Sequence, residues 1–347
     1  MLSARFAAQL LTGPPAAEPV AVAERLLAIQ AQDLRGARLA IRARSCGLTA
    51  ADVDRALACR SLVVTWLNRG TLHLVRSEDY WWLHGLTTPL LFSGIGKRLA
   101  REGVPPSEAD RAVAVIEAAL AEQGPLTRHQ IAEVLTRHGV HSEGQALVYL
   151  LALASLRGIV VRGPIAAATQ TYVLVRDWLG TPPKAGDRDR ALAELARRYL
   201  AGHGPASERD LSKWAGLPLR DARRGLTAIA AELADRPDGL ACLARSPDPG
   251  LCPPPKLLGS FDPLLHGWVS REPVLGDRQG VITVNGMFRP FALVAGRAAG
   301  TWRLDGGQVV LTPFRPLGEA EADALRSEAD DVVRFLGLSP ERRAAPS

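Results

Sequence analysis

The stretch EQGPLTRHQIAEVL at residues 122–135 has a counterpart later in the chain, GHGPASERDLSKWAG at residues 202–216. In both stretches Gly-Pro is followed by a hydroxyl residue, Thr127 or Ser207, that can cap the N-terminus of a helix. A short amphipathic segment follows each cap, and a helical pattern precedes each Gly-Pro. The chain therefore contains a repeated unit in which a helix, a capped turn and a short helix follow one another.

The first copy of this unit continues into a pair of strands. A second helix is predicted at about 143–157, and the segments IVVRG and TYVLV after it have the composition of a hairpin. Helix, short helix, helix and two-stranded wing is the order of a winged helix, a variant of the helix-turn-helix. The second copy has its second helix at about 218–234, but only one short predicted strand, 239–245, before the proline-rich linker SPDPGLCPPPK.

A third, weaker copy precedes the other two. Residues 20–32 are predicted as a helix, and RGARLAIRAR and AADVDRALA as two more. SLVVTWLNRGTLHLV predicts two strands around the turn Asn68-Arg69-Gly70. After residue 256, β-rich runs separated by glycine turns predict a small antiparallel sheet or barrel, closed by a helix at 318–336.

These patterns predict an α+β protein with three tandem winged-helix modules and a C-terminal antiparallel β domain. The expected boundaries are 1–100, 101–185, 186–256 and 257–347. A chain of 347 residues with 47% apolar residues is long enough to bury several cores, which agrees with two to four domains.

The positive charge of the chain is unevenly distributed. The formal net charge is +6; the first 100 residues carry 12 Lys and Arg against 7 Asp and Glu, whereas the other 247 carry 30 against 29. A basic surplus confined to the N-terminal third suits a polyanionic partner such as nucleic acid. A solvated surface in an arginine-rich protein is the alternative explanation.

Neither a membrane span nor a metal site is expected. No uncharged apolar stretch reaches 18 residues, and the N-terminus lacks the apolar region of a convincing signal peptide. The four cysteines form no C-x-x-C pair, and the histidines show no zinc-like spacing. We expect a cytoplasmic protein with reduced thiols.

The segment AIQAQD at residues 28–33 places Gln30 and Gln32 on either side of one alanine. In a helix, residues two apart point to nearly opposite sides, whereas in an extended segment they share a face. Either one glutamine is incidental, or the helix ends here and both side chains reach the same target. Helix capping or simple exposure is the alternative role for the pair.

Four segments in order, spanning about residues 1–316, resemble a known family: LLAIQAQDLRGARLAIRAR, TWLNRGTLHLVRSEDYWWL, LLGSFDPLLHGWVSRE and FRPFALVAGRAAGTWR. The family is the winged-helix, AlkZ/YcaQ-like group of bacterial alkylpurine and interstrand-crosslink DNA glycosylases. Its signature is Gln–apolar–Gln, or Gln–apolar–Asp in a second branch, and Gln30-Ala31-Gln32 matches the first. Ser270 departs from the pattern, since it stands where an acidic residue is expected before Arg271.

The resemblance implies a C-shaped fold with a basic cleft for duplex DNA. It implies a monofunctional DNA glycosylase that hydrolyses the N-glycosidic bond of purines alkylated at N7 or N3, including crosslinked purines. Gln30 and Gln32 would be the catalytic residues and would position the attacking water. No metal or other cofactor would be needed, and the protein would act as a monomer, associated with the nucleoid.

Several residues near the glutamines are candidates for DNA contacts. Arg35 and Arg38, with Arg42 one turn on, share one face of the helix that follows the pair, where they could bind phosphates or simply be solvated. Arg69 in the hairpin turn and His73 on the strand after it line the cleft according to the resemblance. Core packing is the alternative for His73.

The aromatic residues Trp66, Trp81 and Trp82 could stack on a lesion, but core packing is the more common role of tryptophan. Asp262 in the segment SFDP is a candidate cap residue or a residue that supports the site residues from behind, and Asp-Pro is also a common turn.

A non-catalytic winged-helix transcriptional regulator is the rival function. It would read base edges through helix 218–234, where Arg220, Arg223 and Arg224 lie, and it would usually dimerise. The basic surplus near the glutamines favours the enzyme.

Overall fold

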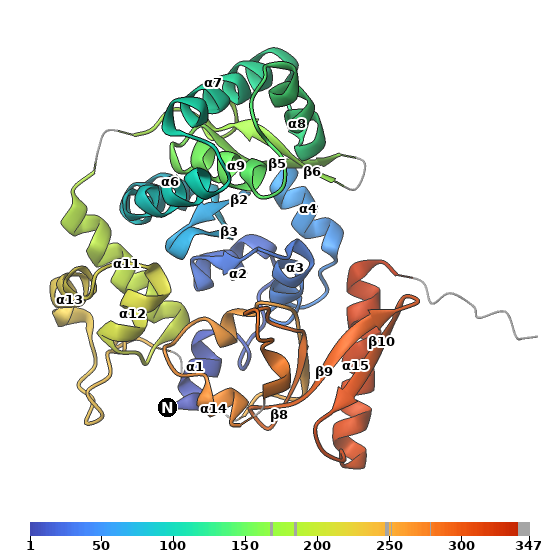
Figure 1. The fold of residues 1–347 in the computed structure, drawn as a ribbon. Helices are drawn as coiled ribbons and strands as arrows, with labels where there is room; N and C mark the ends of the chain where they lie inside the picture. The colour runs from blue at the N-terminus through green and yellow to red at the C-terminus, as the bar shows by residue number, and fades with distance from the viewer. Residues whose placement is uncertain (167–168, 184–185, 247–249, 251, 278, 339–347) are drawn as a thin grey trace, which may run out of the picture.

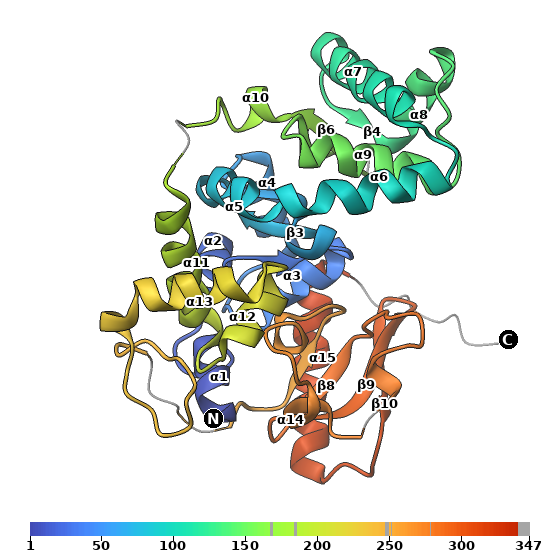
Figure 2. The same ribbon diagram turned by 60° about the vertical axis from the view of Figure 1, so that its left-hand side comes forward.

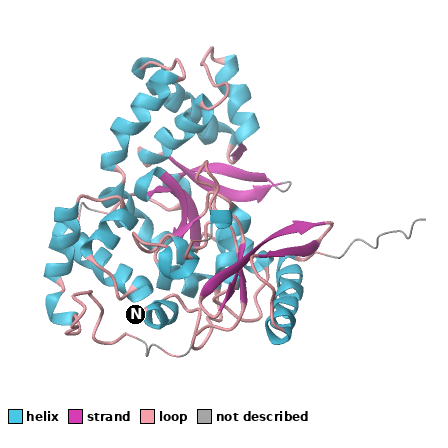
Figure 3. Ribbon diagram, turned by 60° about the horizontal axis from the view of Figure 1, so that its bottom comes forward, coloured by secondary structure: helices cyan, strands magenta, loops and turns pink. Residues whose placement is uncertain are grey.

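The computed structural model describes residues 1–166, 169–183, 186–246, 250, 252–277 and 279–338. Helices and strands are mixed along the chain, and the strands form two separate sheets within these residues (Figure 3). The N-terminal part contains α1 (Leu2–Ala8), α2 (Pro19–Leu26), β1 (Ile29–Gln30), α3 (Leu34–Arg42), α4 (Ala50–Ala58), β2 (Leu62–Leu67), β3 (Thr71–Arg76), α5 (Tyr80–Thr87) and α6 (Phe92–Arg101).

The remaining elements follow in three groups. The first group is α7 (Pro106–Gln123), β4 (Leu126–Thr127), α8 (Arg128–Arg137), α9 (Ala146–Leu156), β5 (Val160–Ala166), β6 (Thr169–Leu174) and α10 (Val175–Trp178). The second group is α11 (Arg188–His203), α12 (Glu208–Ala215) and α13 (Leu219–Ala228). The third group is β7 (Lys256–Leu258), α14 (Glu272–Leu275), β8 (Phe291–Val294), β9 (Arg297–Asp305), β10 (Gln308–Pro313) and α15 (Glu319–Leu336).

The two predicted helix caps are confirmed. The Thr127 hydroxyl accepts a hydrogen bond from the Gln130 amide at 3.3 Å, and the Gln130 side chain accepts one from the Thr127 amide at 2.8 Å. Ser207 and Asp210 form the same reciprocal arrangement at the start of α12. Each pair satisfies two backbone N–H groups that the first turn of a helix leaves open.

The larger sheet joins the first two predicted modules. Its strand order is β1-β3-β2-β5-β6-β4, and all of its pairings are antiparallel. The modules meet where Val64 of β2 pairs with Arg162 of β5. Helices α7, α8 and α9 with strands β4 to β6 have the element order expected of a winged helix. The winged-helix assignment and the module boundaries remain predictions.

This sheet separates two hydrophobic cores. Val64 and Leu74 belong to the core that contains residues of α7, α8 and α9, whereas Val63 and Val75 belong to the core that contains residues of α5 and α11. Neighbouring residues of a strand point to opposite faces, so the alternation assigns each strand residue to one core. The C-terminal sheet, in the order β10-β9-β8-β7, is also antiparallel and packs against α15, as predicted.

The N-terminal part occupies the centre of the molecule. In Figures 1 and 2, α2, α3 and β3 lie between the α7–α9 group, the α11–α13 group and the C-terminal sheet. Contacts of α2 with α11, of β2 with α9 and of α3 with β7 and α15 connect this centre to all three. Residues from every part of the chain can therefore meet close to the glutamine pair.

Some local predictions were wrong. The helix predicted over 20–32 ends at Leu26, because Leu27 adopts φ 64° and ψ −49°, which leaves the helical region. The short strand predicted at 239–245 is absent from the described residues there. In its place are isolated bridges: Ala241 pairs with Ala206 and Leu243 with Leu233, so the two residues have different partner segments and no continuous strand pairing develops.

A fully buried ion pair fastens the C-terminal part to the centre. Arg44 donates to both carboxylate oxygens of Asp262, at 2.9 and 2.8 Å, and neither side chain is exposed. Arg44 also donates to Gln9 and to the Ala40 carbonyl oxygen. Asp262 accepts from the Leu264 amide, so the predicted cap at this aspartate is confirmed.

Asp262→Asn should destabilise the protein strongly. The substitution leaves the Arg44 charge buried without its counter-charge, and breaking a buried pair in this way costs about 3–5 kcal/mol of unfolding free energy. Urea denaturation followed by circular dichroism measures the effect. The matched control is Asp323→Asn on the exposed face of α15, which should change stability by less than about 0.5 kcal/mol. Equal stability of the two variants would contradict the role of the pair.

Candidate active site

Gln30 lies in a two-residue strand at the edge of the larger sheet. The chain leaves α2 through Leu27 and enters β1, where Gln30 pairs with His73 of β3. His73 in turn pairs with Thr65 of β2, so the three residues form one row across the sheet. Directly opposed residues of antiparallel strands share a face. Gln30 is 8% exposed.

Gln32 lies just beyond this strand and is exposed. Its carbonyl oxygen Oε1 accepts a hydrogen bond from the Leu72 amide at 3.0 Å, and the Leu72 carbonyl oxygen accepts from the Ala31 amide at 2.8 Å. Asp33 then caps α3 by accepting from the Arg35 amide, and it also accepts from the Ser260 hydroxyl at 2.6 Å. The glutamine pair is therefore outside any helix.

Both glutamine side chains reach the same short segment of the hairpin. Oε1 of Gln30 accepts from Nη2 of Arg69 at 3.3 Å, and Oε1 of Gln32 accepts from the Leu72 amide. Each carbonyl oxygen keeps a second lone pair that can accept a further hydrogen bond, and each amide keeps two N–H donors. The arrangement can hold a small polar molecule without a charged group.

Arg69 occupies a strained position in the turn between β2 and β3. Its φ is 37°, in the left-handed region that costs a non-glycine residue about 1–3 kcal/mol. Its guanidinium also donates to the Trp214 carbonyl oxygen in α12. Gly216 permits the close approach of α12 to this turn, since a Cβ atom at residue 216 would lie 2.8 Å from the backbone nitrogen of Arg69.

His73 is buried, with 2% of its surface exposed. Burial, followed by the nearby charge of Arg69, lowers the pKa of His73 to about 3, so the ring is neutral at physiological pH. Its Nδ1 lies 3.0 Å from the Thr71 carbonyl oxygen, which requires a proton on Nδ1 and leaves Nε2 as an acceptor. The burial leaves His73 little surface for contact with DNA.

Three residues that the sequence did not single out as site residues lie around this row. Burial lowers the pKa of His266 well below its usual range, and the positive charges of Arg69 and Arg271 lower it further. Lys213 of α12 precedes Trp214, whose carbonyl oxygen accepts from Arg69, and it donates to the Val269 carbonyl oxygen two residues before Arg271. Strongly shifted pKa values cluster at functional sites. Only the scarcity of lysine in the chain could have drawn attention to Lys213.

The other arginine candidates lie on α3 and are largely engaged by the protein. Nε of Arg38 donates to Asp54 at 2.8 Å, and Arg42 is buried and ion-paired with Glu328 and Asp331 of α15. Arg35 is exposed. The arginine face of α3 is therefore neither a solvated surface nor a row of free cations, because two of its three guanidinium groups hold neighbouring helices.

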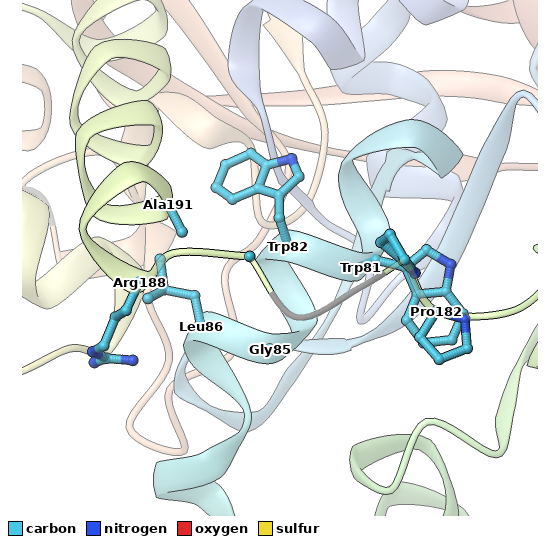
Figure 4. Close-up of a pocket in the computed structure, with 9 residues that line it drawn as sticks. Trp81, Trp82, Gly85, Leu86, Pro182, Arg188 and Ala191 are labelled. Carbon is cyan, nitrogen blue, oxygen red and sulfur yellow. The ribbon is translucent and has the colours of Figure 1, made fainter.

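None of the three candidate tryptophans shares a hydrogen bond with the glutamines among the described residues, although Trp66 pairs across the hairpin with Leu72, whose amide donates to Gln32. Trp66 is buried in the core around α9, as expected for core packing. Trp81 and Trp82 line an apolar pocket with Pro182 and Ala191, where α5 approaches the start of α11 (Figure 4). Trp82 also donates to Asp79.

Within the described residues there is neither a metal-binding cluster nor a membrane-spanning helix. No group of three or more His, Cys, Asp or Glu side chains in that part of the chain is placed to hold a metal ion. No helix there combines the length and the apolar character needed to cross a membrane.

The two deeply buried histidines should make stability depend on pH. Burial lowers the pKa of both His73 and His203 to about 3, against an unfolded value near 6.5. The unfolded chain therefore binds more protons between pH 6.5 and 3, and the free energy of unfolding falls as the pH falls through this range. Each histidine contributes a slope of up to about 1.4 kcal/mol per pH unit.

His73→Asn should reduce this slope by up to about 1.4 kcal/mol per pH unit, since it removes one of the two groups. Urea denaturation at intervals between pH 4.5 and 6.5 measures it. His129→Asn, at a side chain that is 84% exposed, is the control and should leave the slope unchanged. An unchanged slope in His73→Asn would show that His73 titrates normally in the folded protein.

Comparison with known proteins agrees with this architecture. Residues 23–335 match the family model described as DNA glycosylase AlkZ-like. The chain is 28% identical over 355 residues to the interstrand DNA cross-link repair glycosylase of Streptomyces sahachiroi, with 94% of this chain and 93% of that protein covered. It is also similar to the solved structure of Streptomyces sahachiroi DNA glycosylase AlkZ, with a TM-score of 0.76, 25% identity and coverage of 97% and 96%. The family predicted from the sequence is confirmed: the chain belongs to the AlkZ-like DNA glycosylases.

Proposed function

We propose that this protein is a monofunctional DNA glycosylase that hydrolyses the N-glycosidic bond of purines alkylated at N7 or N3. Gln30 and Gln32 position the attacking water. The observation that carries the proposal is that both carbonyl oxygens reach one segment, residues 69–72, from a backbone that is not helical. Gln30 is buried, with 8% of its surface exposed, whereas Gln32 is exposed, so solvent reaches the pair from the side of Gln32.

The chemistry suits uncharged amides. Alkylation at N7 or N3 makes the purine cationic and a good leaving group, so the enzyme needs little acid catalysis. The water oxygen forms a bond to C1′ while the C1′–N bond breaks, and the electron pair of that bond neutralises the purine. The glutamine oxygens accept hydrogen bonds from the water and aim its lone pair, and the surplus proton passes to solvent because an amide cannot keep it. Positioning of this kind supplies several kcal/mol.

The groups beside the glutamines support water positioning over general-base catalysis. Asp33 is occupied by the Arg35 amide and the Ser260 hydroxyl, and the depressed pKa of His73 makes it a weak base. His73 pairs with Gln30 across the strands, so we assign it to the positioning of Gln30 rather than to DNA contact.

The substrate is duplex DNA bound by a monomer. The similar Streptomyces protein is named for interstrand cross-link repair, and we extend that substrate class to this chain: crosslinked purines are alkylated purines with the same labile bond. Arg69 and the exposed Arg35 are the proposed contacts to the DNA backbone, whereas Arg38 can contribute only if it releases Asp54. We place the DNA in a basic cleft beside the central sheet, and the enzyme in the cytoplasm near the nucleoid.

The regulator hypothesis fits less well. Membership of a DNA glycosylase family favours an enzyme. The predicted recognition helix, α13, also has its arginines engaged: Arg223 pairs with Glu208 and Arg224 with Asp189.

Release of N7-methylguanine from methylated duplex DNA tests the function. Gln30→Ala and Gln32→Ala should each lower the single-turnover rate by roughly 100-fold, because the water loses one of its two positioning groups. Gln123→Ala, at an exposed glutamine at the end of α7, is the matched control and should release at the wild-type rate.

Two outcomes would contradict the proposal in different ways. Equal release by wild type and both glutamine variants would remove the pair from the mechanism. Absence of release by wild type, together with tight binding to one particular DNA sequence, would favour a regulator.

A further inference from the structure

We propose that Arg69, Lys213 and Arg271 together form a binding site for one phosphate group of the damaged strand, and that Arg69 couples this phosphate to the orientation of Gln30. The inference rests on the proposed function, since it names how the same site holds its substrate.

The three cations come from distant parts of the chain and meet through the backbone. Arg69 in the β2–β3 turn donates to the carbonyl oxygen of Trp214, the residue after Lys213. Nζ of Lys213 donates to the Val269 carbonyl oxygen at 3.4 Å, two residues before Arg271. The hairpin turn, α12 and the segment before α14 therefore converge on one place.

These cations have no acidic partner within 4.0 Å among the described residues. Elsewhere in that part of the chain, arginines such as Arg42, Arg44 and Arg197 are ion-paired with carboxylates. The negative charge of Asp210 acts on Lys213, but the Asp210 carboxylate already accepts hydrogen bonds from the Ser207 hydroxyl and from the Val269 amide. It is also 4.0 Å from Arg5. The Asp210 carboxylate is therefore engaged by other groups and does not form an ion pair with Lys213.

Burial and neighbouring positive charge both lower the pKa values of Arg69 and Lys213. Burial, and after it the charge of Arg271, lowers the pKa of Arg69 to about 10. Burial, and after it the charges of Arg271 and Arg69, lowers the pKa of Lys213. Arg69 nevertheless stays cationic at neutral pH. The fold thus maintains a concentration of positive charge that only an external anion can relieve.

Hydrogen-bond donors remain open to that anion. Nε of Arg271 donates to the Leu265 carbonyl oxygen at 2.7 Å, and its guanidinium lies 5.1 Å from the Phe288 ring centroid, which fixes its orientation. Lys213 is exposed, so the cluster is accessible from solvent. Guanidinium forks and an ammonium group together match the geometry of a phosphate. Partial burial of Arg69 and Arg271 strengthens their attraction for it.

The chemistry beside the cluster explains why the anion is a phosphate of the substrate itself. During glycosidic cleavage positive charge moves from the base to the sugar, and three uncompensated cations near Gln30 would oppose this shift. A phosphodiester bound by the cations cancels their potential when the sugar is in place. Without a bound DNA strand, the positive charge of the cluster is not neutralised and continues to oppose cleavage.

Arg69 is the link between phosphate and glutamine. Its Nη2 holds Oε1 of Gln30, while its charge belongs to the cation cluster. The left-handed backbone at Arg69 and the close packing of Gly216 limit the positions of its guanidinium. A phosphate that attracts this guanidinium therefore also determines where Gln30 points.

Binding to a short duplex with a tetrahydrofuran abasic analogue tests the phosphate site without requiring excision. Lys213→Gln should reduce the slope of log Kobs against log salt concentration by about 1, as expected for the loss of one phosphate contact. Arg326→Gln is the charge-matched control on the exposed face of α15, where the arginine pairs with Asp323, and it should leave the slope unchanged. Equal slopes for Lys213→Gln and wild type would overturn the site.

A double-mutant cycle that combines Lys213→Gln with a modified DNA backbone identifies which phosphate Lys213 contacts. A single neutral methylphosphonate is placed in turn at each position flanking the abasic analogue. At one position the wild-type protein should lose as much affinity as Lys213→Gln loses on the unmodified duplex, and the variant should lose little more from the same modification. Strictly additive losses at every position would show that Lys213 contacts none of these phosphates.

The coupling through Arg69 has a separate readout. Arg69→Lys keeps the charge but has one nitrogen in place of a fork, so it cannot hold both Gln30 and a phosphate. Binding to the abasic duplex should stay near the wild-type value, while single-turnover release of N7-methylguanine at saturating enzyme falls roughly 10- to 100-fold. A variant that loses binding and rate in equal measure would contradict the coupling. If wild type releases no base, the proposed function fails, yet the salt-slope and methylphosphonate results still decide the phosphate site.

Discussion

The guanidinium of Arg69 joins three parts of this molecule that are far apart in sequence. It extends from a strained hairpin turn, donates to the Trp214 carbonyl oxygen of α12 and holds the amide oxygen of Gln30 at the sheet edge. A planar group with several donors in fixed directions can make such contacts together, whereas a lysine could not. The position of the glutamine pair therefore depends on the packing of the α11–α13 group against the hairpin.

The central sheet explains why the row that contains Gln30 is polar but uncharged, although the cation Arg69 lies beside it. Alternation along β2 and β3 divides the apolar residues between two cores. The polar row Gln30, His73 and Thr65 lies on the face of the sheet that packs against the core containing α5 and α11. Burial keeps His73 neutral, and the amides cannot ionise. In the proposed function these amides orient a water by hydrogen bonds, which is sufficient only for a base that is already a good leaving group. The selectivity for alkylated purines in the proposed function follows from this weakness.

Several turns and helix caps of the protein, and its family, were predictable from the sequence. The Asn68-Arg69-Gly70 turn, the caps at Thr127 and Ser207 and the membership of the glycosylase family all follow from short motifs. The cationic cluster was not predictable in the same way. No local pattern in the sequence places Lys213 or Arg271 next to Arg69, and only the packing of α12 against the hairpin brings them together.

The sequence by itself determined the features that depend on a few neighbouring residues: the capped helices, the hairpin, the antiparallel C-terminal strands and the closing helix α15. Hydrogen bonds of caps and turns act over three or four residues, so local composition is enough to specify them. The tertiary structure alone decided that the helix before the glutamines ends at Leu26, and that Arg42 is buried against α15 while Arg69 hydrogen-bonds Gln30 and Trp214. Burial and ion pairing depend on partners hundreds of residues away, and no local pattern records which partner a side chain will meet.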